Sequence, residues 1–367
     1  TSIMKGRLRP REVMVVIMHT WALIGFGGMG GWHYSNIKAR LPELNTKGAY
    51  DIRPEALKSA EEKGLYPYSS LDELLADKEV DLVTIATPNN FHKDLAIACL
   101  NAGKNVICEK PVTLNSAELE EIIAASEMNG KLFSIHQNRR WDRDYCIIKE
   151  IVASGVIGKP YFIESRVQGS RGSMHGWRNH KVNGGGMLLD WGVHLIDQMM
   201  NLIDSPVVSV NAHLLKLFGS DVDDNIKLML RFENGVSALL EMSTNCFINL
   251  PRWHMSCTDG TAIIEDWSCK GKMVKLNTNA EMAWDDEIVY TEAGPTRTMV
   301  PRPKTSLTEL PLPDVSSDWS DYYKNILGVL DGEAELIVKP AQALRVMKVI
   351  DLLFKSEEEG HGLACRI

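Results

Sequence analysis

Three residues of this chain have the types and spacing that proton transfer during alcohol oxidation requires. Lys110 ends an apolar run, and Asp190 and His194 lie four residues apart, which places both on one face of a predicted helix. Oxidation of an alcohol removes a hydride from carbon and a proton from oxygen, so a base must reach the hydroxyl. Because histidine titrates near neutral pH, we expect His194 to accept this proton. Asp190 would bind a substrate hydroxyl or orient Lys110, which could polarise the hydroxyl, relay its proton or act as the base.

A glycine-rich loop near the start of the chain indicates a nucleotide that could accept the hydride. It follows the apolar run 21–24 and has the G-x-G-x-x-G pattern, in which the glycines allow a tight turn, close approach of a pyrophosphate and close packing of the next helix. That helix should begin near residue 29 and turn its N-terminal amides toward the phosphates. The loop consists of Gly25, Phe26, Gly27, Gly28, Met29 and Gly30.

Two charged residues beyond this loop bear on which dinucleotide binds. Asp51 lies 26 residues after Gly25, near the offset at which a carboxylate meets the ribose hydroxyls of the adenosine. A carboxylate repels a 2′-phosphate, so we expect NAD as the cofactor. Arg53 keeps NADP possible, because a guanidinium at this place could accept a 2′-phosphate or stack on adenine.

The elements that must position these residues alternate between strands and helices over residues 18–139. This alternation predicts an α/β fold whose N-terminal part is a Rossmann domain, a doubly wound parallel sheet. The predicted strands are 21–24, 80–86, 105–108 and 132–136, and the predicted helices are 53–63, 70–75, 93–102 and 116–129. Ligands bind at the carboxyl ends of such strands. The further cofactor contacts expected there are Thr87, Pro88, Asn89, His92, Glu109 and Lys110.

Residues 140–367 show another pattern, which predicts a second domain built on an antiparallel sheet. Strand-like runs follow one another closely, and a Glu-Asn-Gly turn at 233–235 indicates a hairpin. The predicted strands are 161–168, 207–217, 225–232, 236–244, 253–257 and 261–266. The predicted helices are 145–154, 317–330 and 340–356, and residues 293–314 are predicted to form a long loop.

Taken together, these motifs resemble the glucose–fructose oxidoreductase, inositol dehydrogenase and rhizopine-catabolism family, Gfo/Idh/MocA, from Thr20 to the C-terminus. The resemblance is carried by 25–30, Asp51, 87–92, Glu109-Lys110-Pro111 and the glycines 184–186 that lead into 190–194. It implies that the C-terminal domain has a large, open, mainly antiparallel sheet, through which family members often form dimers or tetramers, and that the last helix packs near the first domain. It also implies that a hydroxyl of a sugar, polyol or related compound is oxidised or reduced with a nicotinamide cofactor.

The loop before the three glycines is expected to cover the substrate. The expected substrate contacts are Lys110, Arg171, His175, Trp177, Asp190 and His194. Some residues have both a ligand-binding and a structural interpretation: Asn138, Arg139, Arg140, Trp253 and Trp284. Asp197 could sit behind His194. A metal held by Asp190, His194 and either His175 or His180 is the rival interpretation, but no HExxH or tight HxxxH spacing supports it, so we expect no metal.

Composition narrows the class of protein further. A net charge of -8 argues against nucleic acid or an anionic membrane as the main partner. The seven cysteines are scattered without a CxxC pair, which favours a reducing cytoplasm over a disulfide framework or zinc site. Residues 1–17 include a basic group and an apolar run without a cleavage site, so we interpret them as a tail or a misassigned start rather than an export signal.

Two other classes of function stay open on these residues. One is a glycoside hydrolase or isomerase with tightly bound NAD, in which a transient oxidation acidifies the neighbouring C–H bond and is then reversed. The other is a non-catalytic sugar sensor, which would be expected to lose Lys110 or His194; both are present. The leading interpretation is an NAD(P)-dependent dehydrogenase that acts on a secondary hydroxyl of a sugar, cyclic polyol or glycoside.

Overall fold

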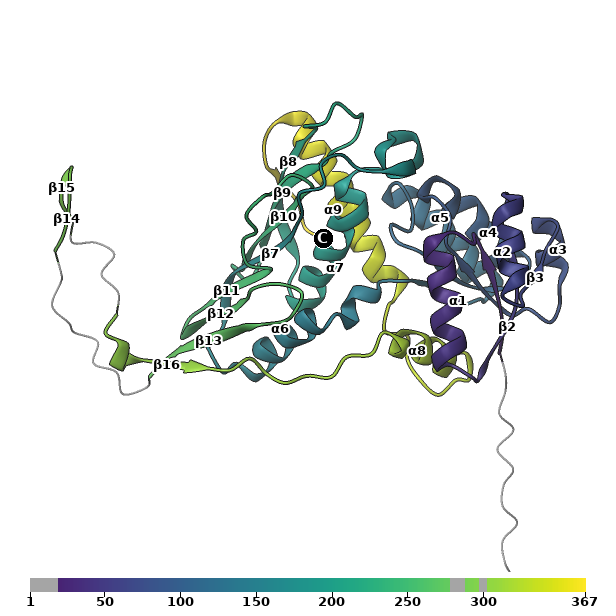
Figure 1. The fold of residues 1–367 in the computed structure, drawn as a ribbon, viewed down its shortest axis with the longest axis horizontal. Helices are drawn as coiled ribbons and strands as arrows, with labels where there is room; N and C mark the ends of the chain where they lie inside the picture. Colours follow the sequence, from purple (N-terminus) through teal and green to yellow (C-terminus); the bar gives the residue numbers. More distant parts are fainter. Residues whose placement is uncertain (1–18, 278–287, 297–301) are drawn as a thin grey trace, which may run out of the picture.

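Two large sheets, a small two-stranded sheet and the helices around them make up the described part of the protein (Figure 1). The computed structural model describes residues 19–277, 288–296 and 302–367. The predicted tail, 1–17, and Trp284 therefore lie outside the described residues. Helices α7 (Val193–Leu202) and α9 (Pro340–Glu359) lie between the two sheets in this view.

The first sheet has six strands that are all parallel, in the order β3-β2-β1-β4-β5-β6. Its strands are β1 (His19–Ile24), β2 (Leu44–Tyr50), β3 (Tyr66–Pro67), β4 (Leu82–Ile85), β5 (Asn105–Cys108) and β6 (Phe133–Ile135). The helices that accompany them are α1 (Gly28–Arg40), α2 (Pro54–Glu62), α3 (Leu71–Ala76), α4 (His92–Asn101) and α5 (Ser116–Asn129). The predicted Rossmann sheet is confirmed.

This strand order decides where a ligand can bind. Strand β4 is buried at every position and apolar except at Thr84, as expected for a strand that helices cover on both faces. The chain runs outward from β1 through β2 and then crosses back to β4, so a crevice opens at the carboxyl ends of β1 and β4. The glycine loop follows β1, the segment 87–92 follows β4, and Glu109 follows β5.

The second sheet has nine strands in the order β16-β13-β12-β11-β7-β10-β9-β8-β17. Neighbouring strands are antiparallel except β10 and β7, which run parallel, so the expected large, mainly antiparallel sheet is confirmed. The strands are β7 (Pro160–Gln168), β8 (Val207–Leu215), β9 (Asn225–Phe232), β10 (Ser237–Ser243), β11 (Trp253–Cys257), β12 (Gly260–Ile264), β13 (Gly271–Leu276), β16 (Leu307–Leu310) and β17 (Leu363–Ala364). A separate hairpin pairs β14 (Val289–Thr291) with β15 (Gly294–Thr296).

Two helices that follow β16 return to the first domain. Helix α8 (Ser320–Leu330) lies beside α1, where the Trp319 and Trp32 rings meet edge to face at 4.9 Å. In α9, Asp351 accepts a hydrogen bond from the amide of Ser116 at 3.0 Å. The remaining helix of the second domain, α6 (Arg143–Ser154), follows the short helix η2 (Asn138–Trp141), so the predicted division after residue 139 falls within a turn and stays a prediction.

Two local predictions differ from the structure. The prediction of a long loop over 293–314 is wrong, because β15 and the edge strand β16 lie inside it; four residues are too few to show an alternating pattern. Asp190 also does not share a regular α-helix with His194. It lies in a π-helical turn, η5 (Leu188–Gly192), that precedes α7.

Two global findings complete the fold. All seven cysteines are unpaired, as their scattered positions led us to expect. Of the helices in the described residues, none has the length and apolar character to cross a membrane.

Candidate active site

The glycine loop has the geometry that its sequence predicts. Gly25 has a φ of +92°, and a Cβ there would lie 2.5 Å from the carbonyl oxygen of Ala86. A Cβ at Gly30 would lie 2.0 Å from the carbonyl oxygen of Gly25, so helix α1 can approach the loop only with glycine at this position. Gly27 is the N-cap of α1. A Cβ placed on Gly27 would have only Nη2 of Arg53 within 4 Å, at 3.7 Å. The exposed amides and this open space fit a pyrophosphate.

Asp51 and Arg53 form a closed pair at the end of β2. Arg53 donates from Nε to Oδ1 and from Nη2 to Oδ2 of Asp51, both at 3.0 Å. The amides of Phe26 and Arg53 also donate to this carboxylate, at 2.8 and 2.9 Å. Burial alone would raise the pKa of Asp51, but these hydrogen bonds outweigh it and lower the pKa. The carboxylate is therefore ionised, and the half-exposed Arg53 beside it balances its charge.

The segment after β4 joins the first domain to the glycines of the second. Asn89 is buried and donates to the carbonyl oxygen of Gly184 at 2.7 Å. His92 is fully buried, with its two ring nitrogens each 2.9 Å from a carbonyl oxygen, those of Thr87 and Pro111. A direct contact between His92 and a cofactor would need one of these bonds to open. The predicted cofactor contacts of Thr87 and Pro88, which are half-buried at the crevice, stay predictions.

Glu109 lies behind the crevice rather than on its surface. Its Oε1 accepts hydrogen bonds from two histidines, and its Oε2 faces the amide of Lys110 at 3.2 Å. Only 7% of the residue is exposed. The predicted contact with a cofactor stays a prediction.

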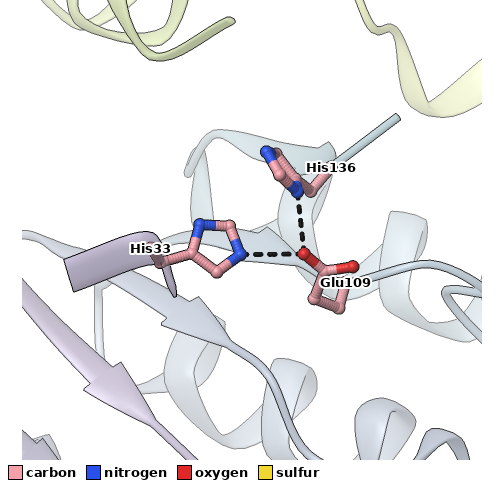
Figure 2. Close-up of side chains that lie close together, drawn as sticks. All are labelled: His33, Glu109 and His136. Atoms are coloured by element: carbon pink, nitrogen blue, oxygen red, sulfur yellow. Dashed lines mark hydrogen bonds and ion pairs between the residues drawn. The ribbon is translucent and has the colours of Figure 1, made fainter. Parts of the chain in front are cut away.

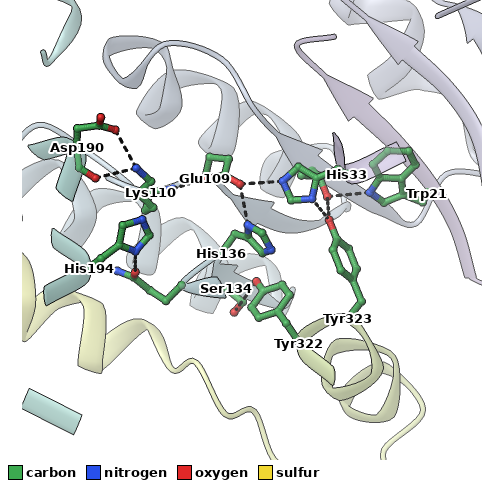
Figure 3. A network of polar contacts seen from close by, with 12 residues as sticks. Trp21, His33, Glu109, Lys110, Ser134, His136, Asp190, His194, Tyr322 and Tyr323 are labelled. Carbon is green, nitrogen blue, oxygen red and sulfur yellow. Dashed lines mark hydrogen bonds and ion pairs between the residues drawn. The ribbon is translucent and has the colours of Figure 1, made fainter. Parts of the chain in front are cut away.

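Lys110 and Asp190 meet across the two domains (Figure 3). The lysine Nζ donates to Oδ1 of Asp190 at 3.0 Å and to its backbone carbonyl at 2.8 Å. Arg178 donates to the same Oδ1 at 3.3 Å. Burial opposes ionisation of Asp190, but the charges of Lys110 and Arg178 hold its pKa below the usual value. Asp190 is thus an anion held between two cations, and its predicted role in orienting Lys110 stays a prediction.

His194 is buried close to Lys110, with Nδ1 3.2 Å from Oε1 of Gln137. An amide oxygen can only accept, so Nδ1 carries the proton and the lone pair lies on Nε2. Burial, followed by the positive charges of Lys110 and Arg139, moves the pKa of His194 well below its usual value. The ring is therefore neutral at neutral pH, with its lone pair on Nε2.

A pocket of about 220 Å³ opens beside Asp190. Of the predicted substrate contacts, Arg171, His175 and Asp190 line it, whereas Lys110, Trp177 and His194 do not. The Trp177 ring instead lies 4.4 Å from the Arg178 guanidinium. The other lining residues are Val167, Gln168, Gly169, Ser173, Met174, Met187, Trp191, Ser243 and Thr244. Trp191 and the strand-end residues were missed from the sequence, because their place in the pocket depends on which strands become neighbours.

Several alternatives from the sequence are resolved by contacts. Trp253 is a core residue with no exposed surface, and it donates to Asp144 at 2.8 Å, so it cannot stack on a substrate. The idea that Asp197 supports His194 is wrong, since Asp197 binds the guanidinium of Arg140 at 2.6 and 2.7 Å. Arg139 stacks on Trp191 at 4.1 Å.

The rival metal site is not formed by the side chains that the sequence offered for it. His175 lines the pocket with Asp190, while His180 is exposed. Within the described ranges, the residues whose ligand atoms come close enough to hold a metal do not include Asp190, His194, His175 or His180.

Comparison with known proteins agrees with this arrangement. Residues 19–137 match the oxidoreductase family with an NAD-binding Rossmann fold, and residues 145–263 match the GFO/IDH/MocA C-terminal domain. The crystal structure of an NAD-binding protein from Listeria innocua is 41% identical, with a TM-score of 0.91 over 95% of this chain and 99% of that one.

Two named relatives are inositol dehydrogenases. The myo-inositol 2-dehydrogenase of Thermotoga maritima is 30% identical over 60% of this chain and 67% of its own length. The NADP⁺-dependent scyllo-inositol 2-dehydrogenase of Bacillus subtilis is 24% identical over 98% of this chain and 97% of its own. With both of its domains matched, the chain belongs to the Gfo/Idh/MocA family of oxidoreductases, whose N-terminal domain is an NAD-binding Rossmann fold.

Proposed function

We propose that this enzyme transfers a hydride between a secondary hydroxyl of a sugar, cyclic polyol or glycoside and the nicotinamide of NAD, with NADP as a possible substitute. The observation that carries the proposal is the contact between Lys110 of the first domain and Asp190 of the second, at 3.0 Å. It brings a cation from the crevice of the parallel sheet to the edge of a pocket, because Asp190 also lines that pocket. Reacting groups supplied by both domains are what a reaction between a bound dinucleotide and a bound alcohol needs.

The proton would be handled by residues of this chain. Lys110, oriented by Asp190, donates a hydrogen bond to the substrate oxygen and stabilises negative charge on it. His194 is neutral, with its lone pair on Nε2, and takes the hydroxyl proton as the C–H bond breaks. When bound, NAD supplies the hydride acceptor. In the reverse direction, protonated His194 returns the proton to the oxygen.

The cofactor is proposed to lie along the glycine loop with its adenosine near Asp51 and Arg53. Both oxygens of Asp51 already accept from Arg53, so ribose hydroxyls would share or replace these bonds. The guanidinium is half-exposed and would attract a 2′-phosphate. This pair supports NAD as the main cofactor and leaves NADP as a possible competitor.

Polar groups around the pocket support a polyhydroxylated substrate. Arg171, His175, Gln168, Ser243 and Thr244 offer hydrogen-bonding side chains near Asp190, and the Trp191 ring adds an apolar surface. A few convergent polar groups beside an apolar face are typical of small-ligand sites. The two relatives named as inositol dehydrogenases support a cyclic polyol in particular.

The first experiment is an assay of NADH absorbance with purified protein, NAD or NADP, and a panel of inositols, sugars and glycosides. We expect NADH formation with one substrate class, lost in Lys110→Met and strongly reduced in His194→Ala. No NADH formation across the panel, with NAD released only on denaturation, would contradict the proposal and favour the closed-cycle hydrolase or isomerase.

We also propose that the enzyme forms a homodimer or homotetramer through the second sheet. Membership of the family supports this part of the proposal, because the resemblance implies dimers or tetramers that form through this sheet. Light scattering should give a particle of two or four chains. A monomer at micromolar concentration would contradict this part of the proposal.

A further inference from the structure

Glu109 is at the centre of a buried cluster that the proposed chemistry does not use (Figure 2). His33 of helix α1 approaches its Oε1 with Nε2 at 2.8 Å, and His136, which follows β6, approaches the same oxygen with Nδ1 at 2.7 Å. Both histidines have no exposed surface. Three elements far apart in the sequence therefore meet at one carboxylate oxygen.

The cluster continues to helix α8 of the second domain (Figure 3). Tyr323 places its hydroxyl 2.7 Å from Nδ1 of His33 and 3.2 Å from Oγ1 of Thr84. Thr84 in turn accepts from Nε1 of Trp21 at 2.8 Å. The chain of contacts thus runs from β1 through β4, α8 and α1 to Glu109, the residue that precedes Lys110.

The charge states follow from the partners. Burial opposes ionisation of Glu109, but the two histidines hold its pKa well below the usual value, so it is a carboxylate. A carboxylate only accepts, so Nε2 of His33 and Nδ1 of His136 must both donate. Burial and the neighbouring His136 lower the pKa of His33 to about 4, so His33 is neutral and its Nδ1 accepts from Tyr323.

A metal ion is the other occupant that these side chains could have. Within the described part of the chain, His33, Glu109 and His136 are the residues whose ligand atoms lie close enough together to hold one. The two nitrogen–oxygen separations are, however, those of hydrogen bonds, and both bonds end on the same oxygen. A metal would need both nitrogens stripped of their protons and a fourth ligand that this group does not include. Hydrogen bonds satisfy the carboxylate without either change.

We propose that Glu109 is a positioning residue for Lys110, a role that rests on the catalytic function proposed above. Oε1 is anchored to α1 and β6, while Oε2 faces the amide of Lys110 at 3.2 Å. The carboxylate thereby fixes the end of β5, and hence Lys110, relative to the helix that begins at the glycine loop. Removing a donor would leave a buried anion short of partners, and the strand end would move to find others.

His136 offers a clean test because it uses only one of its two nitrogens. Nδ1 donates to Glu109, whereas Nε2 is buried without a partner. An asparagine at 136 can keep a donor near the place of Nδ1, while leucine of similar size removes it. His136→Leu should lower kcat on the best panel substrate about 100-fold, the loss that a misplacement of ~1 Å causes, whereas His136→Asn should stay within about fivefold of the parent.

Binding and labelling separate positioning from general damage. NADH affinity, measured by fluorescence, should change less than about threefold in both variants, because the glycine loop is untouched. Labelling of Lys110 by trinitrobenzenesulfonate, read by peptide mass spectrometry with Lys93 as the internal reference, should be several-fold faster in His136→Leu than in the parent or His136→Asn. This readout needs no substrate. Tyr323→Phe, which removes one hydroxyl at the far end, is the milder variant if His136→Leu does not fold, and should show the same changes in smaller measure.

Three results would overturn the positioning role. The first is unchanged kcat and unchanged labelling of Lys110 in both His136→Leu and Tyr323→Phe. The second is a loss of NADH affinity in these variants that is as large as their loss of kcat. The third is about one bound zinc ion per chain in the parent and none in His136→Leu. If Lys110→Met is inactive while these variants are fully active, only the positioning role fails. If Lys110→Met keeps its activity, the proposed function fails, and the positioning role falls with it.

Discussion

The cofactor half and the substrate half of the site are built in different ways. In the first domain, Asp51, Asn89 and Glu109 each have their hydrogen-bonding groups engaged by neighbours in the protein. In the second domain, Arg171 and His175 are exposed, and within the described residues their side chains make no hydrogen bond or ion pair. The groups around the proposed cofactor site are thus held by neighbours in the core, whereas the groups proposed to choose the substrate lie on an exposed loop, where substitutions have little effect on stability.

Replacing Lys110 with methionine should break the junction between the two halves and give the largest effect. The variant keeps the length of the side chain but loses the donor to Asp190 and to the substrate oxygen. We expect kcat to fall about 1,000-fold, within the range for a lost proton-handling group, as measured by NADH absorbance. Lys93→Met is the control, because Lys93 pairs with Glu121 at the surface, and it should stay within about threefold. Equal activity of the two variants would show that Lys110 takes no part in the reaction.

Asp223 belongs to the buried part of the substrate half, as His194 does, and it supports the turn that carries Asp190. Its Oδ2 accepts from the amide of Leu188 at 2.7 Å, and burial raises its pKa to about 6 from 3.8. A raised folded-state pKa means that stability is fully present below about pH 4 and is lost as pH rises through 6. The loss should approach about 3 kcal/mol of unfolding free energy by pH 7.5, as an upper limit.

Urea unfolding of the parent and of Asp223→Asn at pH 4.5 and 7.5 measures this loss. The amide keeps an acceptor for Leu188 but cannot ionise, so the variant should lack this part of the pH dependence. Other titrating groups are common to both proteins and cancel in the difference. Identical pH dependence of the two proteins would mean that Asp223 ionises as easily in the fold as in water.

Arg53→Ala sharpens the comparison in the cofactor half. Without the guanidinium, Asp51 is free to accept from ribose hydroxyls and its charge faces any 2′-phosphate. NADPH should bind about tenfold more weakly relative to NADH, which fluorescence titration with both nucleotides measures. The exposed Lys58 on the following helix supplies the matched control, because Lys58→Ala removes a charge from the same surface. If Arg53→Ala and Lys58→Ala changed the ratio of NADPH to NADH affinity equally, the effect would come from the lost net charge and not from the pair that Arg53 forms with Asp51.

The smallest effects are expected from His175→Ala and Trp177→Ala on the loop of the substrate half. His175 lines the pocket, so its loss should raise KM about three- to fivefold with kcat and unfolding free energy nearly unchanged. Trp177 stacks on Arg178 outside the pocket lining, so its effect on KM should be smaller than that of His175. A larger effect from Trp177 would mean that the loop closes over the substrate.

The same contrast explains what the sequence could predict. The glycine loop, Asp51 and Lys110 were predictable because each follows a strand of a parallel sheet, and the carboxyl ends of such strands meet at one edge. His33 and Tyr323, which are in contact, lie 290 residues apart in the sequence, so no local sequence pattern predicts their contact. The π-helical turn at Asp190 and the edge strand β16 were missed for the same reason, since a buried Asp223 and a neighbouring strand decide them. Trp253 was considered as a residue that could stack on a ligand, because its residue type alone does not show that its side chain is buried.

The link between Tyr323 and His33 also has a consequence for synthesis on the ribosome. When synthesis has reached residue 200, Lys110, Asp190 and His194 are already present in the chain, but helix α8 does not yet exist. At about 5–20 residues per second, on the order of ten seconds pass before Tyr323 can reach its partner. During that interval, the buried His33 of the first domain lacks the hydroxyl of Tyr323 as its hydrogen-bond partner. The enzyme can therefore become fully assembled only after helix α8 has been synthesised, although no residue of this helix is among the groups proposed to react.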